Sequence, residues 1–458
     1  MSASPVNSVA IAAPAGADGK AAPQLQPQLQ LQPRQRPEPA TWQQTGLPFL
    51  FLADLVLKVV FLRGQLHMTE LGSHIRISTN IVDGITVFLR AEKLCEIARR
   101  GTSNTDADVL YTLTDAGRHR ATILMAQNAY TGPAPVTLED YCLQVEAQSV
   151  ANMRVGSHDM QRLFAGIEVS PNILGQIGAA MNSRRALYVH GPAGSGKTYL
   201  AERLCGLLNG SVLVPHAVLI NGEIMQLFDP SVHEPAPAPV GVRSILEKSV
   251  RIDGRWVECR RPTVVTGGEL TMAMLDLQFD DGTRFYQSPS HLKANNGIFI
   301  IDDLGRQRCS AVELMNRWIV PLDRRKDYLS LHTGHKFQVP FDVIVVFSSN
   351  LAPGKLADDA FSRRLGYKIY IGEQSPDAYE RIFRQECVTQ QVPWSADAFD
   401  YLIHEKHTAQ GRGLMACYPR DLIAQVCDLA RYEGTPPELN RRVLDWAWNN
   451  YFIGGLPQ

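Results

Sequence analysis

The chain contains a glycine-rich run that ends in lysine and threonine, made of Gly191, Pro192, Ala193, Gly194, Ser195, Gly196, Lys197 and Thr198. Small residues let backbone N–H groups close around an anion, and the N-terminus of a following helix adds its positive dipole end. In such a loop a lysine reaches the β- and γ-phosphates of a nucleotide, and a threonine hydroxyl ligates Mg²⁺. The run therefore predicts a nucleoside triphosphate site, with Lys197 on phosphate and Thr198 on Mg²⁺.

The residues on either side fit the strand–loop–helix order that a phosphate-binding loop requires. An apolar stretch at 186–189 precedes the run, and a helix-like stretch at 199–204 follows it. A fortuitous glycine-rich loop would need neither neighbour, so the flanking pattern favours nucleotide binding.

Two adjacent carboxylates follow a second apolar run farther along the chain. Residues 297–301 are almost continuously apolar, and Asp302 and Asp303 come directly after them. Such a run is typical of a buried parallel strand, whose carboxyl end faces the crevice where ligands bind. Taken alone, two aspartates can simply end a strand. Downstream of a phosphate loop, Asp302 is predicted to hold Mg²⁺ through water and Asp303 to polarise the attacking water.

Three weaker signals follow in order. Asn350 ends another apolar run, at 341–347, and could orient a water or contact the γ-phosphate. Arg363 and Arg364 form a pair after an acidic stretch, and Arg420 lies near the start of a predicted helix. Each alone is more often a solvated or capping residue.

Together, in this order and spacing, these elements resemble the AAA+ ATPase family over about residues 160 to 450. The resemblance places Walker A on Gly191 to Thr198, Walker B on Asp302 and sensor 1 on Asn350. It places the arginine finger on Arg364 and sensor 2 on Arg420. Arg364 is chosen as the finger because the family places it before an apolar residue, here Leu365, and Arg363 is the alternative.

The resemblance implies ATP and Mg²⁺ as ligands and ATP hydrolysis as the activity. It also implies a homo-oligomer, a ring or partial ring, because a finger acts on a neighbour's nucleotide. The chain departs from the family at Asp303, where glutamate is usual. A side chain one methylene shorter positions water less well, and catalysis is sensitive to displacements of about 1 Å. Hydrolysis is favoured, and a switch driven mainly by nucleotide binding stays open.

Composition limits the other classes of function. A formal net charge of −1 argues against a chain that works mainly by global attraction to nucleic acid or acidic lipid. The eight cysteines are scattered without a Cys-x-x-Cys pair, which is typical of reduced thiols rather than of a zinc site. The chain start has no secretory signal pattern, and the apolar stretch 47–62 is short for a membrane span and carries Asp54 and Lys58. We therefore expect a cytoplasmic protein without a membrane span.

The predicted fold class is α/β, and the 458 residues have room for two or three domains. The expected parts are a disordered Ala/Pro/Gln-rich tail (1–41), a winged helix-like α+β domain (46–128), a linker (129–160), an AAA+ α/β core (161–372) and a helical lid (373–452). In the lid, Trp446 and Trp448 are expected to pack inside rather than to bind a base.

The winged helix-like interpretation rests on a succession of predicted elements. Three helices are expected at 48–62, 68–75 and 79–93, followed by two strands at 94–98 and 109–113. A last helix is expected at 116–128, with Thr114 or Asp115 as its N-terminal cap. The third helix has one apolar face and is expected to expose Thr79, Asn80, Asp83, Thr86 and Arg90.

Whether this domain binds DNA or protein is left open by the sequence. Residues 64–128 contain seven Arg or Lys against seven Asp or Glu, whereas DNA readers usually present a basic face. Arg99 and Arg100 in the expected wing could still make a local contact. Protein docking is therefore favoured over DNA binding.

A long insertion, about 214–294, separates the phosphate loop from Asp302. Strand-like pieces at 256–258, 263–266, 272–279 and 284–286 alternate with turn signals, after a proline-rich opening at 233–239. Two interpretations stay open: a mobile hairpin that projects toward a pore or partner, and an edge hairpin that extends the core sheet. The insertion and lid also have some resemblance to the MoxR-like and related chaperone branch.

The function predicted from these features is a Mg²⁺-dependent AAA+ ATPase that remodels or assembles a macromolecular complex, with a protein client that the sequence does not identify. Two alternatives are a DNA-associated AAA+ ATPase of the initiator, loader or transposition-helper type, and a nucleotide-gated scaffold with little hydrolysis.

Overall fold

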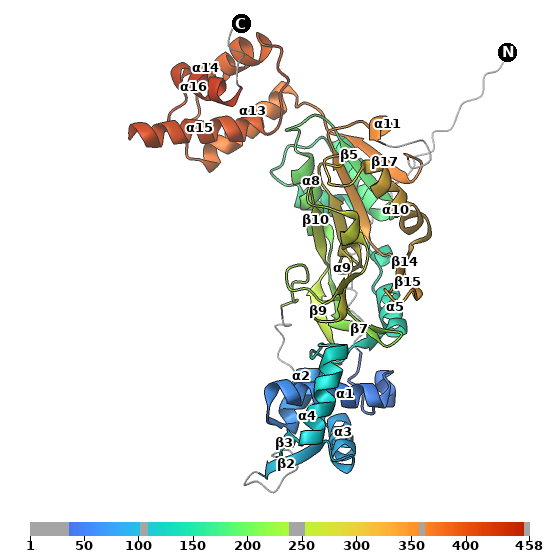
Figure 1. Ribbon diagram of the computed structural model, residues 1–458. Coiled ribbons are helices and arrows are strands. Elements are labelled where there is room, and N and C mark those ends of the chain that lie inside the picture. The colour runs from blue at the N-terminus through green and yellow to red at the C-terminus, as the bar shows by residue number, and fades with distance from the viewer. Residues whose placement is uncertain (1–35, 101–108, 238–251, 357–361, 453–458) are drawn as a thin grey trace, which may run out of the picture. The chain divides into compact units, whose positions relative to one another are not determined.

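The structure is a computed structural model that describes residues 36–100, 109–237, 252–356 and 362–452. It combines a parallel β-sheet flanked by helices with smaller sheets and helical regions, which confirms the predicted α/β class (Figure 1). The tail predicted to be disordered lies almost entirely outside the described residues. No helix in the described ranges is long and apolar enough to cross a membrane.

The first part of the chain folds around the helix α1, which is buried along most of its length. Its elements are a 3₁₀ turn (Gln43–Thr45), α1 (Phe49–Arg63), β1 (Leu66–His67), α2 (Met68–Ile75), α3 (Thr79–Ala91), β2 (Cys95–Arg100), β3 (Val109–Leu113) and α4 (Asp115–Gln127). All six predicted elements are present, and Thr114 is the cap of α4, because its hydroxyl accepts a hydrogen bond from the Gly117 N–H at 3.1 Å. Sequence reasoning missed β1, which completes an antiparallel sheet in the order β1-β3-β2.

One expectation about α3 is wrong. Thr86 is buried rather than exposed, at 1% of its surface. Its hydroxyl donates to the Asp83 carbonyl one turn earlier at 2.9 Å, so the polar atom is satisfied without water. The expected wing residues 101–108 lie outside the described residues.

A five-stranded parallel sheet forms the core around the phosphate loop. Its strands run in the order β10-β13-β16-β5-β17, with bounds Thr263–Thr266, Ile298–Ile301, Ile344–Ser349, Ala186–His190 and Leu365–Tyr370. The strand that ends near Asn350 therefore lies between the strand that leads into the loop and the strand that ends at Asp302.

Helices cover both faces of this sheet. Leu187 and Val189 of β5 pack with α7 (Pro171–Ser183) and α8 (Lys197–Arg203) on one face. Tyr188, which points to the other face, packs in the same core as Trp318 of α10 (Ala311–Arg324). The continuous apolar runs in the sequence follow from this burial on two sides.

The insertion and the expected linker together form a second sheet. Its strands run in the order β11-β12-β8-β7-β4, with bounds Gln278–Asp280, Phe285–Gln287, Glu223–Gln226, Ala217–Ile220 and Val136–Thr137. The helix α5 (Leu138–Ala147) contributes Tyr141 and Val145 to the core of this sheet. Residues 129–160 thus include packed structure, because Val136 pairs with Val218 of the insertion.

The edge-hairpin interpretation of the insertion is wrong as stated, because among the described strands of the insertion only β10 joins the core sheet, as its outer strand. Most of the other described strands pair with one another or with β4. The projecting hairpin stays a prediction. The expected strand 272–279 begins instead as a 3₁₀ turn, Met272–Leu275, whose Leu275 is buried in the core under α10. Two further strand pairs are β6 (Ser211–Pro215) with β9 (Trp256–Arg260) and β14 (Lys326–Ser330) with β15 (Lys336–Pro340). Residues 238–251 of the insertion lie outside the described residues.

The C-terminal region is helical, as predicted. Its helices are α13 (Pro376–Thr389), α14 (Ala396–Tyr401), a π-helical segment (Leu402–Thr408), α15 (Tyr418–Glu433) and α16 (Arg441–Tyr451). Trp448 is buried among them, but Trp446 is 42% exposed, so the expectation that both tryptophans pack inside is wrong for Trp446. The two residues are two positions apart on α16 and therefore cannot share one face of a helix. The remaining short helices are a 3₁₀ turn (Val150–Asn152), α6 (Ser157–Leu163), a second 3₁₀ turn (Leu204–Leu207), α9 (Ser290–Lys293) and α11 (Pro353–Leu356).

Candidate nucleotide site

The glycine-rich run forms the turn between β5 and α8. Gly194 and Gly196 have φ of 80° and 94°, values that residues with a Cβ rarely adopt. At Gly191 a Cβ would lie 1.9 Å from the Ile371 carbonyl oxygen, so a larger residue cannot fit between β5 and the end of β17. These constraints explain why glycine occupies these positions.

Lys197 begins α8 and points back over the loop. Its ammonium group donates to the Pro192 carbonyl oxygen at 2.8 Å, and the residue is only 5% exposed. Burial lowers the pKa of this ammonium group, while the nearby charges of Asp303 and Asp302 act in the opposite direction. A buried cation beside two carboxylates is suited to bind a multiply charged phosphate.

Thr198 and Asp302 meet across the crevice at the end of the sheet. The Thr198 hydroxyl lies 2.8 Å from Asp302 Oδ2 and 3.0 Å from Oδ1. The backbone N–H of Asp302 donates to the Thr266 carbonyl at 2.8 Å, which fixes the carboxylate at the end of β13. A hydroxyl and a carboxylate are hard oxygen ligands of the kind that Mg²⁺ uses together with water and substrate phosphates.

A second observation also indicates that the loop could bind a phosphate group. The Ser195 hydroxyl, in the middle of the loop, is buried and has no hydrogen-bond partner among the described residues. Buried polar groups are normally satisfied, so an unpaired one in a phosphate-type loop favours a ligand as its partner. Within the described ranges, no group of three or more His, Cys, Asp or Glu side chains could hold a metal by itself. A cation here would therefore share its ligands between Thr198, Asp302 and the nucleotide.

Asp303 and Asn350 also come together. The Asn350 side-chain amide donates to Asp303 Oδ1 at 3.3 Å. Asp303 adopts a left-handed φ of 48°, a conformation that aspartate tolerates better than most residues. The guanidinium of Arg306 lies 3.9 Å from the other carboxylate oxygen of Asp303. The carboxylate is thus oriented by two neighbours.

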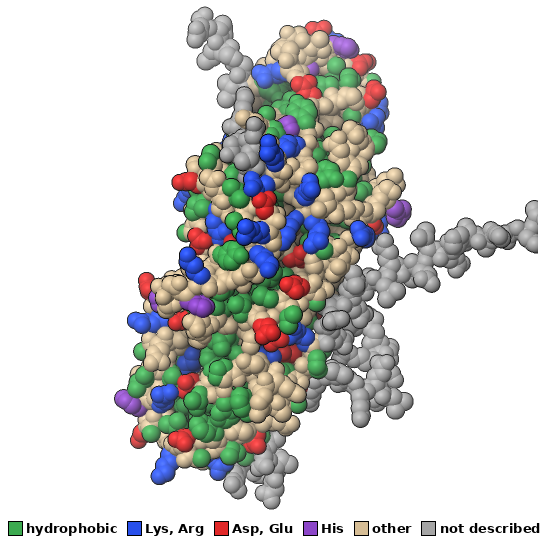
Figure 2. Space-filling view, turned by 90° about the vertical axis from the view of Figure 1, so that its right-hand side faces the viewer, with side chains coloured by type: hydrophobic (Ala, Val, Ile, Leu, Met, Phe, Trp, Pro, Cys, Tyr) green, Lys and Arg blue, Asp and Glu red, His purple; other side chains and the backbone are tan. Residues whose placement is uncertain are grey.

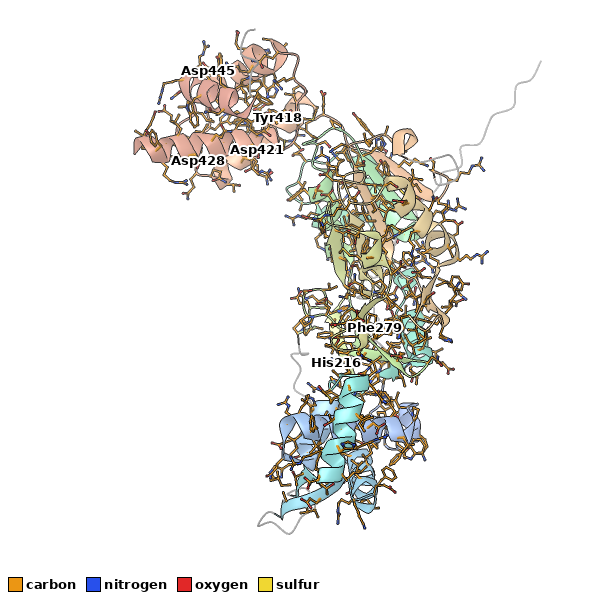
Figure 3. All side chains as sticks on the ribbon, in the orientation of Figure 1. His216, Phe279, Tyr418, Asp421, Asp428 and Asp445 are labelled. Carbon is orange, nitrogen blue, oxygen red and sulfur yellow. The ribbon has the colours of Figure 1, made fainter. Side chains whose placement is uncertain are left out.

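The C-terminal helices contribute one wall of the same cavity. Its volume is about 1210 Å³, and Lys197, Thr198, Asp303, Asn350 and Arg420 are among its lining residues. The Cys417 N–H donates to the Gly194 carbonyl at 3.1 Å, which joins the start of α15 to the phosphate loop. Tyr418 and Asp421 lie near that start and Asp428 farther along (Figure 3).

Arg420 is held by Asp421 at the wall of the cavity. Its Nε donates to Asp421 Oδ1 at 3.0 Å, and this hydrogen bond raises the pKa of the guanidinium. The other oxygen of Asp421 accepts a hydrogen bond from the Tyr451 hydroxyl at 2.8 Å. The guanidinium is therefore oriented from α16 as well as from α15.

Arg363 and Arg364 are not brought into this cavity. Arg364 forms an ion pair with Asp323 of α10, with Nε 2.7 Å from Oδ2, and Arg363 is exposed. Residues 357–361, the first part of this motif, lie outside the described residues.

Sequence reasoning missed a contact across the cavity wall. Arg381 of α13 and Glu168, which precedes α7, both line the cavity and form an ion pair with Nε 2.9 Å from Oε1. Arg306 was also missed, although its position three residues after Asp303 is a usable signal. Glu168 and Arg381 carry no such signal, because they are far apart in the sequence.

Comparisons with known proteins add similarities of limited extent. Residues 375–450 match the model of a domain of unknown function, DUF8689. No curated protein matches the chain. Among solved structures, NtrX from Brucella abortus is similar at 14% identity and a TM-score of 0.37, over 66% of this chain and 60% of that one, less than two thirds of its length.

Two other solved structures are similar at the same level. A point mutant of Thermotoga maritima RuvB has 12% identity and a TM-score of 0.36, over 68% of this chain and 76% of that one. A complex between subunits BchI and BchD of magnesium chelatase has 14% identity and a TM-score of 0.31, over 60% of this chain and 89% of that one.

Proposed function

We propose that the chain is a Mg²⁺-dependent ATPase of the AAA+ type, which hydrolyses ATP to remodel or assemble a macromolecular complex. The observation that carries the proposal is the meeting of Thr198 with Asp302 beside the buried Lys197, at the carboxyl end of a parallel sheet. Three residues from two distant segments thus supply the groups that a nucleotide–Mg²⁺ complex requires.

In this proposal each residue has a separate task. The loop N–H groups and Lys197 bind the phosphates, and Thr198 and Asp302 hold the cation. When bound, Mg²⁺ neutralises charge on the phosphate oxygens. Asp303 accepts a hydrogen bond from the attacking water, and Asn350 orients the Asp303 carboxylate, to which it already donates.

The arginines divide between the subunit's own site and its neighbour's. Arg420 lines the subunit's own cavity and is proposed to contact the nucleotide from the C-terminal helices. Arg364, with Arg363 as the alternative, is proposed to act on the nucleotide of a neighbouring copy in a ring or partial ring. Its position outside the cavity agrees with action in trans. Residues 46–128, in a winged helix-like arrangement, are proposed to select the target.

A nucleotide-gated scaffold is the second candidate, and Asp303 is the observation that favours it. The carboxylate is short, and both of its oxygens already have a neighbour in Asn350 and Arg306. An aspartate carboxylate held by two neighbours reaches the attacking water less readily than the longer side chain of a glutamate would. ATP binding would then set the state of the assembly with little turnover.

Calorimetric titration with ATP in the presence of Mg²⁺ tests the nucleotide site. We expect the wild type to bind and Lys197→Ala to bind about 10- to 150-fold more weakly, the usual value of a charge-assisted hydrogen bond. Arg203→Ala is the matched control, because Arg203 lies on the same helix, contacts Tyr199 and does not line the cavity. Equal affinity of the wild type and Lys197→Ala would contradict the proposal.

A further inference from the structure

Basic residues lie where the strands of the core sheet begin, on the side opposite to the phosphate loop. Arg184 and Arg185 directly precede β5, and Arg363 and Arg364 directly precede β17. The two strands are parallel and pair Ala186 with Leu365, so the two arginine pairs are neighbours. Arg185 packs so closely on Gly366 that a Cβ there would lie 2.3 Å from the Arg185 Cβ.

The end of α10 adds further cations on the same side. Arg324 is its last residue, Arg325 caps it, and Lys326 begins β14. The Arg325 guanidinium donates to the Val343 carbonyl oxygen at 3.1 Å, which fixes it beside β16, and burial followed by the nearby Arg184 charge lowers its pKa. These residues therefore continue the basic surface from β5 toward the β14–β15 hairpin.

The hairpin extends this surface with one aromatic residue. On its outer face Lys326, Tyr328 and Ser330 of β14 pair with Pro340, Gln338 and Lys336 of β15, and Tyr328 is 51% exposed. On the inner face the alternate residues are buried, including Asp327. Strand alternation thus turns the acidic residue inward and the basic and aromatic residues outward.

Two acidic residues next to this surface are already engaged. Asp323 forms the ion pair with Arg364. Asp342 accepts hydrogen bonds from the Ser149 hydroxyl, the Val150 N–H and the Asn296 amide, at 2.7 to 2.8 Å. Figure 2 shows lysine and arginine side chains gathered on the face that carries α10, β17 and the hairpin.

We propose that this basic edge, defined as Arg184, Arg185, Arg324, Arg325, Lys326, Tyr328 and Lys336, binds the sugar-phosphate backbone of a single-stranded nucleic acid. Arginine dominates the set, and its planar fork matches phosphate oxygens. An exposed tyrosine among cations offers an unpaired base a surface for stacking.

A neighbouring copy with its bound nucleotide is the other occupant to consider. A single triphosphate would engage only one or two of these cations and would leave the hairpin lysines and Tyr328 without a role. A strand of nucleic acid presents a phosphate at every nucleotide and matches the whole length of the edge. The first part of the chain fits this ligand less well, because Arg90 is the single cation on the exposed side of α3.

Fluorescence anisotropy with a labelled 20-nucleotide oligothymidine tests the proposal, with the full chain and at several salt concentrations. Binding at this edge does not require ATP hydrolysis, so it can fail independently of the proposed ATPase activity. We expect Arg184→Gln/Arg185→Gln and Arg324→Gln/Lys326→Gln to reduce the salt dependence by about 0.7 in log–log slope for each phosphate that the variant no longer neutralises. Tyr328→Ala is expected to weaken binding about 5- to 150-fold, the usual value of one base–aromatic stack.

The matched control is Arg431→Gln/Arg442→Gln, which removes two exposed arginines from the C-terminal helices that pair with Asp428 and Glu433. This variant is expected to bind like the wild type, and the unfolding midpoint of each variant checks that it is folded. Absence of binding by the wild type at low salt, or equal binding by the edge variants and the control, would overturn the proposal. So would edge variants that lose self-association in sedimentation while their affinity for the oligonucleotide is unchanged, because the edge would then be an interface between copies.

Discussion

The Thr198 hydroxyl donates a hydrogen bond to the Asp302 carboxylate across the crevice at the end of the core sheet, at 2.8 Å. Thr198 follows β5 near the start of α8, and Asp302 follows β13. The two residues meet because these parallel strands have their carboxyl ends on the same side of the sheet. In the proposed function the Thr198 hydroxyl and, through water, the Asp302 carboxylate would hold Mg²⁺, which would neutralise charge on the phosphates.

Asp303 is expected to limit the rate of hydrolysis. Asp303→Glu should raise ATP turnover, because the longer side chain extends past Asn350 and Arg306 toward the water. Asp303→Asn should lower turnover by about 10²-fold or more and leave ATP binding nearly unchanged, because an amide cannot accept the water's proton. Steady-state turnover and calorimetric affinity, measured on the same preparations, separate the two effects. An unchanged turnover in Asp303→Asn would remove Asp303 from the mechanism.

Arg364 is expected to act on a neighbouring subunit. Arg364→Ala alone should lower turnover by about 10³-fold or more, as the loss of an arginine finger does, and retain ATP binding. Lys197→Ala alone should also be inactive. A mixture of the two should recover part of the activity, because the Lys197→Ala subunit supplies an intact arginine to the intact nucleotide site of its partner. A mixture as inactive as its components would show that Arg364 does not act in trans, and the same assay with Arg363→Ala tests the alternative residue.

Arg255 forms a buried ion pair within the insertion and also donates a hydrogen bond to the first part of the chain. Arg255 donates to Asp253 at 2.7 Å and to the Thr45 carbonyl at 3.0 Å, and both charged side chains are 3% exposed. Arg255→Met should lower the free energy of unfolding by about 3–5 kcal/mol, because the buried Asp253 carboxylate then has no cation beside it and keeps only the hydrogen bond from the backbone N–H at position 255. Denaturant titration measures this loss.

The exposed pair of Arg260 with Glu234 provides the control for that variant. Arg260→Met should change the stability by less than about 1 kcal/mol, because an exposed ion pair is screened by solvent. Arg255→Met/Asp253→Leu should lose less than Arg255→Met alone, since neither charge is left unpaired. An Arg255→Met variant as stable as the wild type would show that the buried pair does not stabilise the fold.

His407 is expected to make the C-terminal helices sensitive to acid. Burial lowers the pKa of its imidazole to about 4, and its Nε2 lies 3.1 Å from the Tyr379 hydroxyl. The unfolded chain takes up a proton near the ordinary pKa of about 6.5, whereas the folded chain does not, so stability is lost as pH falls from about 6.5 to about 4. The slope from this residue is at most about 1.4 kcal/mol per pH unit.

Unfolding free energies of the wild type and His407→Gln between pH 7 and pH 5 check this expectation. The variant should lose part of the wild-type slope, whereas His404→Gln, an exposed position in the same π-helical segment, should retain it. His216 contributes in the same direction, because burial and Arg76 lower the pKa of its imidazole to about 4. Identical slopes in the wild type and His407→Gln would show that His407 does not carry the effect.

Local patterns in the sequence predicted most of the elements and the inner part of the site. The phosphate loop and the runs before Asp302 and Asn350 are short-range signals, because burial on both faces of a sheet makes each strand continuously apolar. The parallel order of the strands then brings Thr198, Asp302, Asp303 and Asn350 to one edge. The core strands and these four residues could therefore be placed from local patterns together with a parallel order of the strands.

The parts that could not be predicted depend on contacts between distant segments. The pairing of Val136 with Val218 turns the expected linker into part of a sheet, and no local pattern encodes it. The ion pair between Glu168 and Arg381 has the same character. Thr86 was misplaced because its hydroxyl is satisfied within its own helix, which a polarity pattern does not reveal.

ATP turnover as a function of protein concentration, for the wild type beside Lys197→Ala and with Mg²⁺ present, is the decisive experiment for the proposed ATPase. We expect a wild-type rate that rises cooperatively with concentration and disappears when Mg²⁺ is chelated. We also expect a loss of about 10²-fold or more in Lys197→Ala, because the buried cation stabilises charge on the phosphates. Equal and negligible turnover of both proteins, with ATP still bound by the wild type, would refute the ATPase and leave the nucleotide-gated scaffold in its place.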